Sequence, residues 1–91
     1  MSTIPKSLKH LDVSFNRISG SLPNIDIDLT GLFVQGNYLT DLGRLPESLQ
    51  NANFSLNPLT NTGELCSRKL VTCELKKTKL NATTCGTCLF S

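Results

Sequence analysis

The 91-residue chain is long enough for one domain but for only a modest hydrophobic core, since 38% of its residues are apolar. It contains no run of about 18 apolar residues that would span a membrane, and its first 30 residues lack the apolar stretch of a signal peptide. The net charge of +2 is unevenly spread, because residues 1–65 carry four bases and six acids while residues 66–91 carry five bases and one acid. Additional support is therefore expected from stacked repeats, from the four cysteines or from a neighbouring chain.

From residue 8 onward, one pattern of apolar residues with a fixed asparagine recurs along the chain. Its starts lie 21, 20 and 21 residues apart, and the fourth copy has cysteine in an apolar position and threonine in place of asparagine. The copies are Leu8-x-x-Leu11-x-Val13-x-x-Asn16-x-Ile18, Leu29-x-x-Leu32-x-Val34-x-x-Asn37-x-Leu39, Leu49-x-x-Ala52-x-Phe54-x-x-Asn57-x-Leu59 and Leu70-x-x-Cys73-x-Leu75-x-x-Thr78-x-Leu80.

The two central apolar residues of each copy alternate with polar ones, which predicts a short strand with those two side chains inward. The strands are expected near 8–15, 29–36, 49–56 and 70–77. An asparagine carries both donor and acceptor atoms, so Asn16, Asn37 and Asn57 are predicted to form a ladder that pairs backbone groups where the chain turns. Phe15 and Leu56, which precede the asparagine, are expected to pack partly at the sheet edge.

The return segments are too short for long helices. The stretches "ISGSLPNIDID" (18–28) and "LTDLGRLPES" (39–48) mix glycine, proline and small polar residues, which favours extended or 3₁₀-like turns. Leu42, Leu45 and Leu65 are expected to fill this side of each coil.

The pattern resembles the leucine-rich repeat family over roughly residues 4–80, and the approaches "IPKSL", "LPNIDIDL" and "LPESL" agree with it. The short period is similar to compact repeats of bacterial proteins and protist surface proteins. The resemblance implies an α/β solenoid with mostly short parallel strands on a concave face and irregular or 3₁₀ convex returns. We expect repeats over 1–80 and, overlapping the last one, a cysteine-containing cap over 66–91.

The outward strand positions would form the ligand-binding concave face of such a solenoid. Phe33 is the only aromatic residue among them, and an aromatic residue flanked by polar groups is typical of a contact centre. The alternatives are that Phe33 folds over its own sheet or is covered by a neighbouring chain. The predicted ligand-binding residues are His10, Asp12, Ser14, Phe33, Gln35, Asn51, Asn53, Ser55, Glu74 and Lys76.

The cysteines Cys66, Cys73, Cys85 and Cys88 all lie in the same C-terminal part of the chain as the excess of bases. Many extracellular leucine-rich repeat proteins close with a cysteine-containing cap, so the resemblance favours disulfides and a location outside the cell or on its surface; a zinc site is the alternative. By repeat register, Cys66 is expected to pair with Cys85 or Cys88, and Cys73 is either a buried thiol or bonded to the remaining cysteine. The two glycosylation sequons, at Asn53 and Asn81, are about as many as this composition produces by chance.

No residue pattern supports catalysis, a cofactor or a metal. His10, Asp12 and Ser14 have the residue types of a catalytic triad, but strand geometry places the backbones of His10 and Ser14 about 13 Å apart. The acidic "IDID" (25–28) lacks the glycine hinge of a calcium loop. The basic group is read as a solvated cap rather than as a nucleic-acid site, and its members are Arg68, Lys69, Lys76, Lys77 and Lys79.

We therefore predict a non-catalytic recognition module that binds a protein ligand or another copy of itself, as the C-terminal fragment of a longer solenoid. A membrane would be reached only through an anchor of that parent protein. The first coil, beginning near Ile4, would leave its apolar cross-section open to water, which suggests a self-assembly element as an alternative. A further alternative is an anionic glycan or surface bound by the basic cap.

Overall fold

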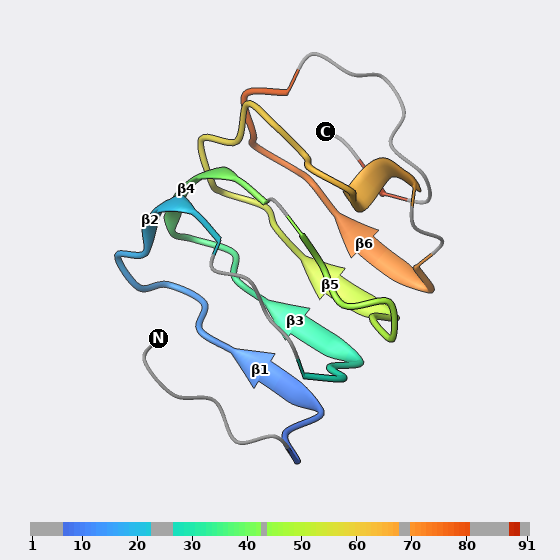
Figure 1. The fold of residues 1–91 in the computed structure, drawn as a ribbon. Coiled ribbons are helices and arrows are strands. Elements are labelled where there is room, and N and C mark those ends of the chain that lie inside the picture. Colours follow the sequence, from blue (N-terminus) through green and yellow to red (C-terminus); the bar gives the residue numbers. More distant parts are fainter. Residues whose placement is uncertain (1–6, 23–26, 43, 68–69, 81–87, 90–91) are drawn as a thin grey trace.

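The computed structural model describes residues 7–22, 27–42, 44–67, 70–80 and 88–89, which form a stack of short coils (Figure 1). Among these residues, no helix is long or apolar enough to cross a membrane. In chain order the elements are β1 (His10–Asp12), β2 (Ser19–Ser21), β3 (Gly31–Phe33), β4 (Tyr38–Asp41), β5 (Asn51–Asn53), the 3₁₀ helix η1 (Leu65–Ser67) and β6 (Thr72–Glu74).

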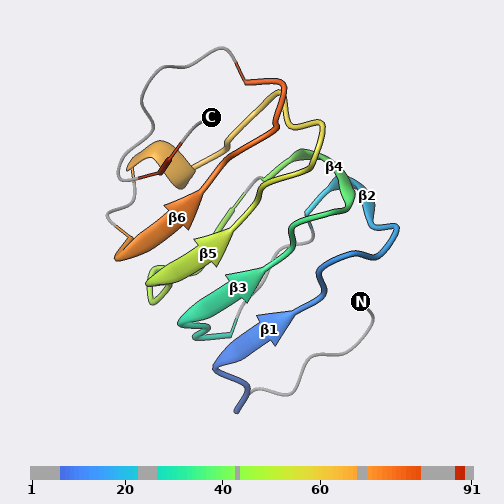
Figure 2. The ribbon, with the colours of Figure 1, turned by 180° about the vertical axis from the view of Figure 1, so that it is seen from behind.

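The main sheet has four parallel strands in the order β1-β3-β5-β6, as seen from both sides in Figures 1 and 2. Its register pairs His10 with Gly31, Gly31 with Asn51 and Asn51 with Thr72. These offsets equal the spacing of the sequence repeat, so equivalent residues of successive coils stack directly on one another. The predicted solenoid of short parallel strands is confirmed.

The return side of the coils is more regular than expected. β2 and β4 pair in parallel as a second, two-stranded sheet, and an isolated bridge joins Asp41 to Asn61 in the next coil. Because the coils stack at a uniform spacing, extended return segments meet the same segment of the next coil and their backbone groups can pair. The predicted 3₁₀ character appears only at η1 among the described returns.

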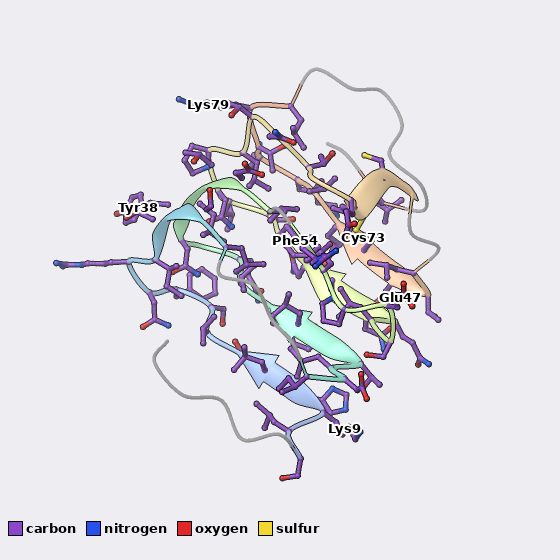
Figure 3. All side chains as sticks on the ribbon, in the orientation of Figure 1. Lys9, Tyr38, Glu47, Phe54, Cys73 and Lys79 are labelled. Carbon is purple, nitrogen blue, oxygen red and sulfur yellow. A yellow bond between two sulfur atoms is a disulfide. The ribbon has the colours of Figure 1, made fainter. Side chains whose placement is uncertain are left out.

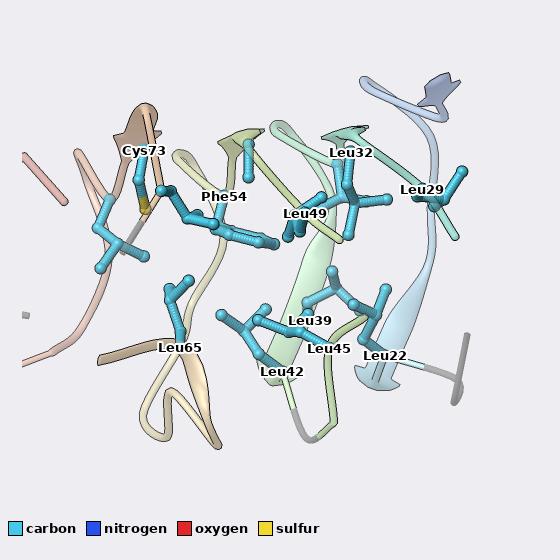
Figure 4. Packing of buried hydrophobic residues seen from close by; sticks show 14 of the residues in the cluster. Leu22, Leu29, Leu32, Leu39, Leu42, Leu45, Leu49, Phe54, Leu65 and Cys73 are labelled. Carbon is cyan, nitrogen blue, oxygen red and sulfur yellow. The ribbon is translucent and has the colours of Figure 1, made fainter. Parts of the chain in front are cut away.

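The core lies between the main sheet and the returns (Figure 4). In the second coil Leu29, Leu32 and Val34 are fully buried. In the third coil Phe54 is fully buried beside the small Ala52, so one large and one small side chain share the layer. The return residues Leu42, Leu45 and Leu65 are buried too, which confirms their predicted role.

The first coil is less completely covered than the second. Leu8, Leu11, Val13 and Ile18 are partly buried and pack against the core from one side. Their counterparts in the second coil have a coil on either side and are buried completely. The end of the stack that β1 forms therefore contributes less apolar burial to stability than the centre does.

A left-handed residue precedes the ladder position in every coil. The φ angles are 55° at Phe15, 74° at Gly36, 58° at Leu56 and 59° at Lys77. Only glycine adopts this conformation without steric cost, so the other three are strained. Phe15 and Leu56 were expected to pack partly at the sheet edge; the Phe15 ring lies against Gly36, and the two side chains are 71% and 49% exposed. The left-handed corner turns their side chains outward.

Candidate functional site

Asn37 and Asn57 connect adjacent coils from inside the turn. Asn57, 1% exposed, accepts a hydrogen bond from Leu39 N–H (3.0 Å) and donates to the carbonyls of Val34 (3.0 Å) and Phe54 (3.1 Å). Asn37, 4% exposed, repeats this arrangement one coil earlier.

In detail, Asn37 accepts a hydrogen bond from Ile18 N–H at 3.1 Å and donates to the carbonyls of Val13 (3.1 Å) and Val34 (2.8 Å). Each of these asparagines thus satisfies backbone groups of its own coil and of the preceding one.

Asn16, the third predicted ladder residue, behaves differently. It is exposed and donates only within its own coil, to the carbonyls of Val13 (2.8 Å) and Ser14 (3.0 Å). The described residues place no coil before β1, so Asn16 has no second set of backbone groups to pair. The two central asparagines therefore join coils, while Asn16 shapes a single turn.

At the β1 end, the concave face is built around Gly31. A Cβ atom at Gly31 would collide with the ring of His10 and would lie 3.2 Å from Cε2 of Phe33. The absent side chain lets both rings lean over the strand, which leaves Phe33 half-buried. Phe33 thus folds partly over its own sheet, one of the alternatives, and still presents part of its ring to solvent.

Asp12 and Ser14 form a local turn at the end of β1. Asp12 Oδ1 accepts hydrogen bonds from the Ser14 hydroxyl (2.6 Å) and from Ser14 N–H (3.0 Å). These bonds, the hydroxyl first, lower the pKa of Asp12 below its ordinary value of 3.8. Because the Ser14 hydroxyl donates to Asp12, this pair caps the strand and does not form a nucleophile–base pair with His10.

At the β6 end, polar side chains of adjacent strands pair across the face. Asn53 Nδ2 donates to Glu74 Oε2 (3.1 Å), and Glu74 Oε1 lies 3.4 Å from Lys76 Nζ. Thr72 donates to Asn51 Oδ1 at 2.8 Å. These bonds hold a layer of polar groups in fixed positions on β5 and β6.

The third outward position contributes mainly to the sheet itself. Ser55 is 7% exposed, and its hydroxyl accepts a hydrogen bond from Lys76 N–H at 2.9 Å. Gln35 is half-buried, and its Oε1 atom has no hydrogen-bond partner. Ser55 therefore supports the strand end, while the buried Gln35 oxygen is left unpaired.

A hollow of about 510 Å³ opens on the concave face at the β6 end. Phe33, Asn53 and Glu74, all predicted as ligand-binding residues, line it. The remaining lining residues are Ala52, Val71, Thr72, Cys73 and Leu89. Seven predicted residues lie elsewhere on the face, outside the hollow: His10, Asp12, Ser14, Gln35, Asn51, Ser55 and Lys76.

Two exposed apolar residues of the hollow were missed from the sequence. Val71 is 74% exposed, and it occupies a position that is polar in the three earlier coils: Lys9, Thr30 and Gln50. The change from polar residues to valine at this repeat position could have identified Val71 from the sequence. Leu89 is 59% exposed and lies beyond the repeats, so the repeat pattern carried no information about it.

Leu89 extends the sheet edge next to β6. Its N–H donates to Cys73 O (2.9 Å), and its carbonyl accepts from Leu75 N–H (2.8 Å). The adjacent Cys88 is bonded to Cys73, with Cα atoms 4.4 Å apart. The disulfide therefore fixes the wall of the hollow that Leu89 forms.

This connectivity selects one of the two alternatives predicted for Cys73, the bond to a remaining cysteine, and narrows the prediction for Cys66. Cys66 does not pair with Cys88, and Cys73 is not a buried free thiol, because its inward position brings it within bonding distance of Cys88. Cys66 also takes part in a disulfide, while its other predicted partner, Cys85, lies outside the described residues. The zinc alternative is wrong as well, since a cysteine in a disulfide offers no thiolate to a metal.

Among the described residues, no three histidine, cysteine, aspartate or glutamate side chains gather as metal ligands. Arg68 and Lys69 of the basic group, the sequon asparagine Asn81 and part of the predicted cap lie outside the described residues. The other sequon asparagine, Asn53, faces the hollow.

Residues 7–25 match the family model described as Leucine Rich Repeat. The chain therefore contains a leucine-rich repeat. No curated protein and no solved structure matches it significantly. Leucine-rich repeats in general form protein-interaction modules and are typically non-catalytic, which is consistent with a face of fixed polar and apolar side chains.

Proposed function

We propose that this leucine-rich repeat protein recognises a protein ligand at the hollow of its concave face. The observation that carries the proposal is the composition of the hollow. The half-buried Phe33 faces it from β3, and the exposed Val71 and Leu89 line it near β6. Asn53 and Glu74 add fixed polar groups. Exposed apolar side chains around a few oriented polar atoms suit an apolar side chain of a peptide or protein ligand.

The mechanism is rigid display rather than closure. Hydrogen bonds link Asn53 to Glu74, and the disulfide fixes the chain beside Leu89, so the binding groups lose little conformational freedom when a ligand arrives. The four-stranded face is small compared with a standard interface of about 800 Å² per partner. We therefore infer that affinity depends on one apolar anchor of the ligand, with the rest of the face excluding water.

The disulfides also support a location outside the cell or on its surface, which we include in the proposal. Disulfides persist mainly in oxidising compartments, and Cys66, Cys73 and Cys88 all take part in them. Detection of these bonds by mass spectrometry in protein from the native source would test this point. Reduced thiols in freshly alkylated samples would contradict it.

The binding proposal is tested by selecting ligands without bias. A random peptide library displayed on phage would be selected against the folded chain, and the enriched peptides measured against variants. Phe33→Ala and Val71→Ser are each expected to weaken these peptides roughly 5- to 150-fold, the effect of truncating a hot-spot residue. Tyr38→Ala is the matched control, since Tyr38 is an exposed aromatic residue outside the hollow. Peptides insensitive to both hollow variants but sensitive to the control would overturn the proposal.

A self-assembly element is the second candidate, favoured by the β1 end of the stack. Within the described residues β1 pairs only with β3, and the inward side chains of its coil are only partly buried. Another copy could extend the sheet there. Analytical ultracentrifugation would show a dimer that Asp12→Lys, on the free strand, weakens. A monomer at all accessible concentrations would exclude this role.

A further inference from the structure

The corner where each coil leaves the main sheet carries a second surface, separate from the hollow. The positions just before and just after the ladder residue form two rows across the coils. Backbone hydrogen bonds set their register, from Phe15 N–H to Gln35 O (2.8 Å) and from Leu56 N–H to Lys76 O (2.9 Å). We call the exposed members of these rows the turn ridge: Phe15, Arg17, Tyr38, Leu56, Lys77 and Lys79.

Half of the turn ridge consists of large apolar or aromatic side chains in solvent. Phe15 is 71% exposed, Tyr38 58% and Leu56 49%. The other two large hydrophobic residues that are exposed in the described chain, Val71 and Leu89, belong to the hollow. Phe15 and Leu56 also occupy strained left-handed positions, although the second coil has glycine there. The Phe15 ring lies against Gly36 of the next coil, but most of the surface of Phe15 and of Tyr38 stays in solvent, which points to a partner outside the chain.

The other half of the turn ridge is cationic and uncompensated. Arg17, Lys77 and Lys79 form no ion pair with any described residue. No acidic residue occurs in the corner segments 13–18, 34–39, 54–59 and 75–80. Lys76 differs, because it faces the concave side and pairs with Glu74. The ridge therefore attracts an anionic partner through its two ends, Arg17 in the first coil and Lys77 and Lys79 in the fourth.

The form of the turn ridge favours a flat partner. Tyr38 and Lys79 project from the same margin of the solenoid, away from the margin that carries Glu47 and Lys9 (Figure 3). Four coils at about 4.8 Å spacing give a ridge roughly 14 Å long, which is small for a stable protein interface. A planar partner, by contrast, can contact the corners of all four stacked coils at once. Aromatic and leucine side chains among lysine and arginine are the residues that suit a membrane–water interface.

We propose that the turn ridge binds the surface of an anionic phospholipid bilayer. Phe15, Tyr38 and Leu56 would enter the headgroup region, and the three cations would lie beside lipid phosphates and carboxylates. This inference does not rest on the proposed function, because the hollow shares no residue with the ridge. The chain would attach peripherally, with its concave face still available to a ligand.

The test is co-sedimentation with vesicles of phosphatidylcholine containing about 30% phosphatidylserine, compared with vesicles of pure phosphatidylcholine. We expect binding to the anionic vesicles that weakens as salt is added. Lys77→Glu combined with Lys79→Glu should lower the partition coefficient roughly 30-fold, at about fivefold per cation. Phe15→Ser combined with Leu56→Ser should lower it roughly tenfold at unchanged charge.

The matched control is Lys9→Glu, which equals either single substitution, Lys77→Glu or Lys79→Glu, in charge change. Because Lys9 is an exposed lysine on the opposite margin, this variant should bind as the parent does. Far-UV circular dichroism would establish that each variant is folded. Equal binding to both kinds of vesicle, or an equal loss in Lys9→Glu, would overturn the proposal. A soluble polyanion, poly-glutamate or heparin, would be tested in parallel. If it binds as tightly as the vesicles do, and the two serine substitutions leave that binding unchanged, the ridge is a site for soluble polyanions and the proposal is overturned.

Discussion

Replacing Asn57 by leucine removes the most extensively bonded side chain of the ladder. The leucine cannot pair Leu39 N–H or Phe54 O, which have no other described partner in the turn. Val34 O is spared because Asn37 also donates to it. Two unpaired buried groups at about 1 to 3 kcal/mol each give an expected loss of roughly 2 to 6 kcal/mol. A chain of this length has about 5 to 14 kcal/mol in total, so the loss is a large part of its stability.

Asn16→Leu is the matched comparison, because Asn16 is exposed and bonds only within its own coil. Its expected cost is about 0.5 to 1.5 kcal/mol. The stability of both variants is measured by urea denaturation monitored by far-UV circular dichroism. Intrinsic fluorescence is unsuitable, because the chain has no tryptophan and its single tyrosine is exposed. The Asn57 variant should show much the larger fall in midpoint. Equal falls would refute the idea that pairing between coils, rather than turn formation alone, makes the central asparagines important.

Three further predictions concern the cap, the corners and the strand end. Cys88→Ser should lower the free energy of unfolding by about 3 kcal/mol, the entropic effect of opening a loop of this size, and a thermal midpoint equal to the parent's would contradict the bond to Cys73. Gly36→Ala should destabilise the chain by about 1 to 3 kcal/mol, because the φ angle of Gly36 is 74° and a Cβ there would strike the Phe15 ring. Leu56→Gly should be neutral or stabilise the chain by up to about 1 kcal/mol in the same urea assay, because glycine adopts the φ angle of 58° without strain. Folding lowers the pKa of Asp12, so the carboxylate contributes to folding stability above pH 3.8, and this contribution is lost as the pH falls through the lower pKa of the folded state. Asp12→Asn should therefore make the free energy of unfolding fall less steeply at acid pH, and an unchanged acid dependence would contradict this.

The repeat period was enough to predict the main sheet. A pattern that recurs every 20 or 21 residues with two inward apolar positions allows only one register in which all copies bury the same face, and β1, β3, β5 and β6 adopt it. The buried Leu32 and Val34 and the return residues Leu42 and Leu45 follow from the same pattern. The sequence did not predict pairing of β2 with β4, since the Ser-Gly-Ser sequence of β2 carries no strand signal.

The candidate site was only partly predictable. Phe33, Asn53 and Glu74 could be placed on one face by alternation, and all three line the hollow. Leu89 could not, because its position depends on the bond between Cys73 and Cys88, and cysteine connectivity is not contained in spacing alone. Phe15 and Leu56 were expected to pack partly, but the extent of their exposure could not be predicted, since it depends on the left-handed backbone at these residues.

The central claim, that ligands are recognised at the concave hollow, is tested most directly by nuclear magnetic resonance. A ¹⁵N-labelled sample would be titrated with a peptide selected against the folded chain, and amide shifts followed residue by residue. The account predicts that the largest shifts belong to Phe33, Asn53, Val71, Thr72, Glu74 and Leu89, with little change at Tyr38 or Lys79 on the turn ridge. Shifts concentrated on the turn ridge or on the returns around Leu42, with the hollow residues unchanged, would contradict it.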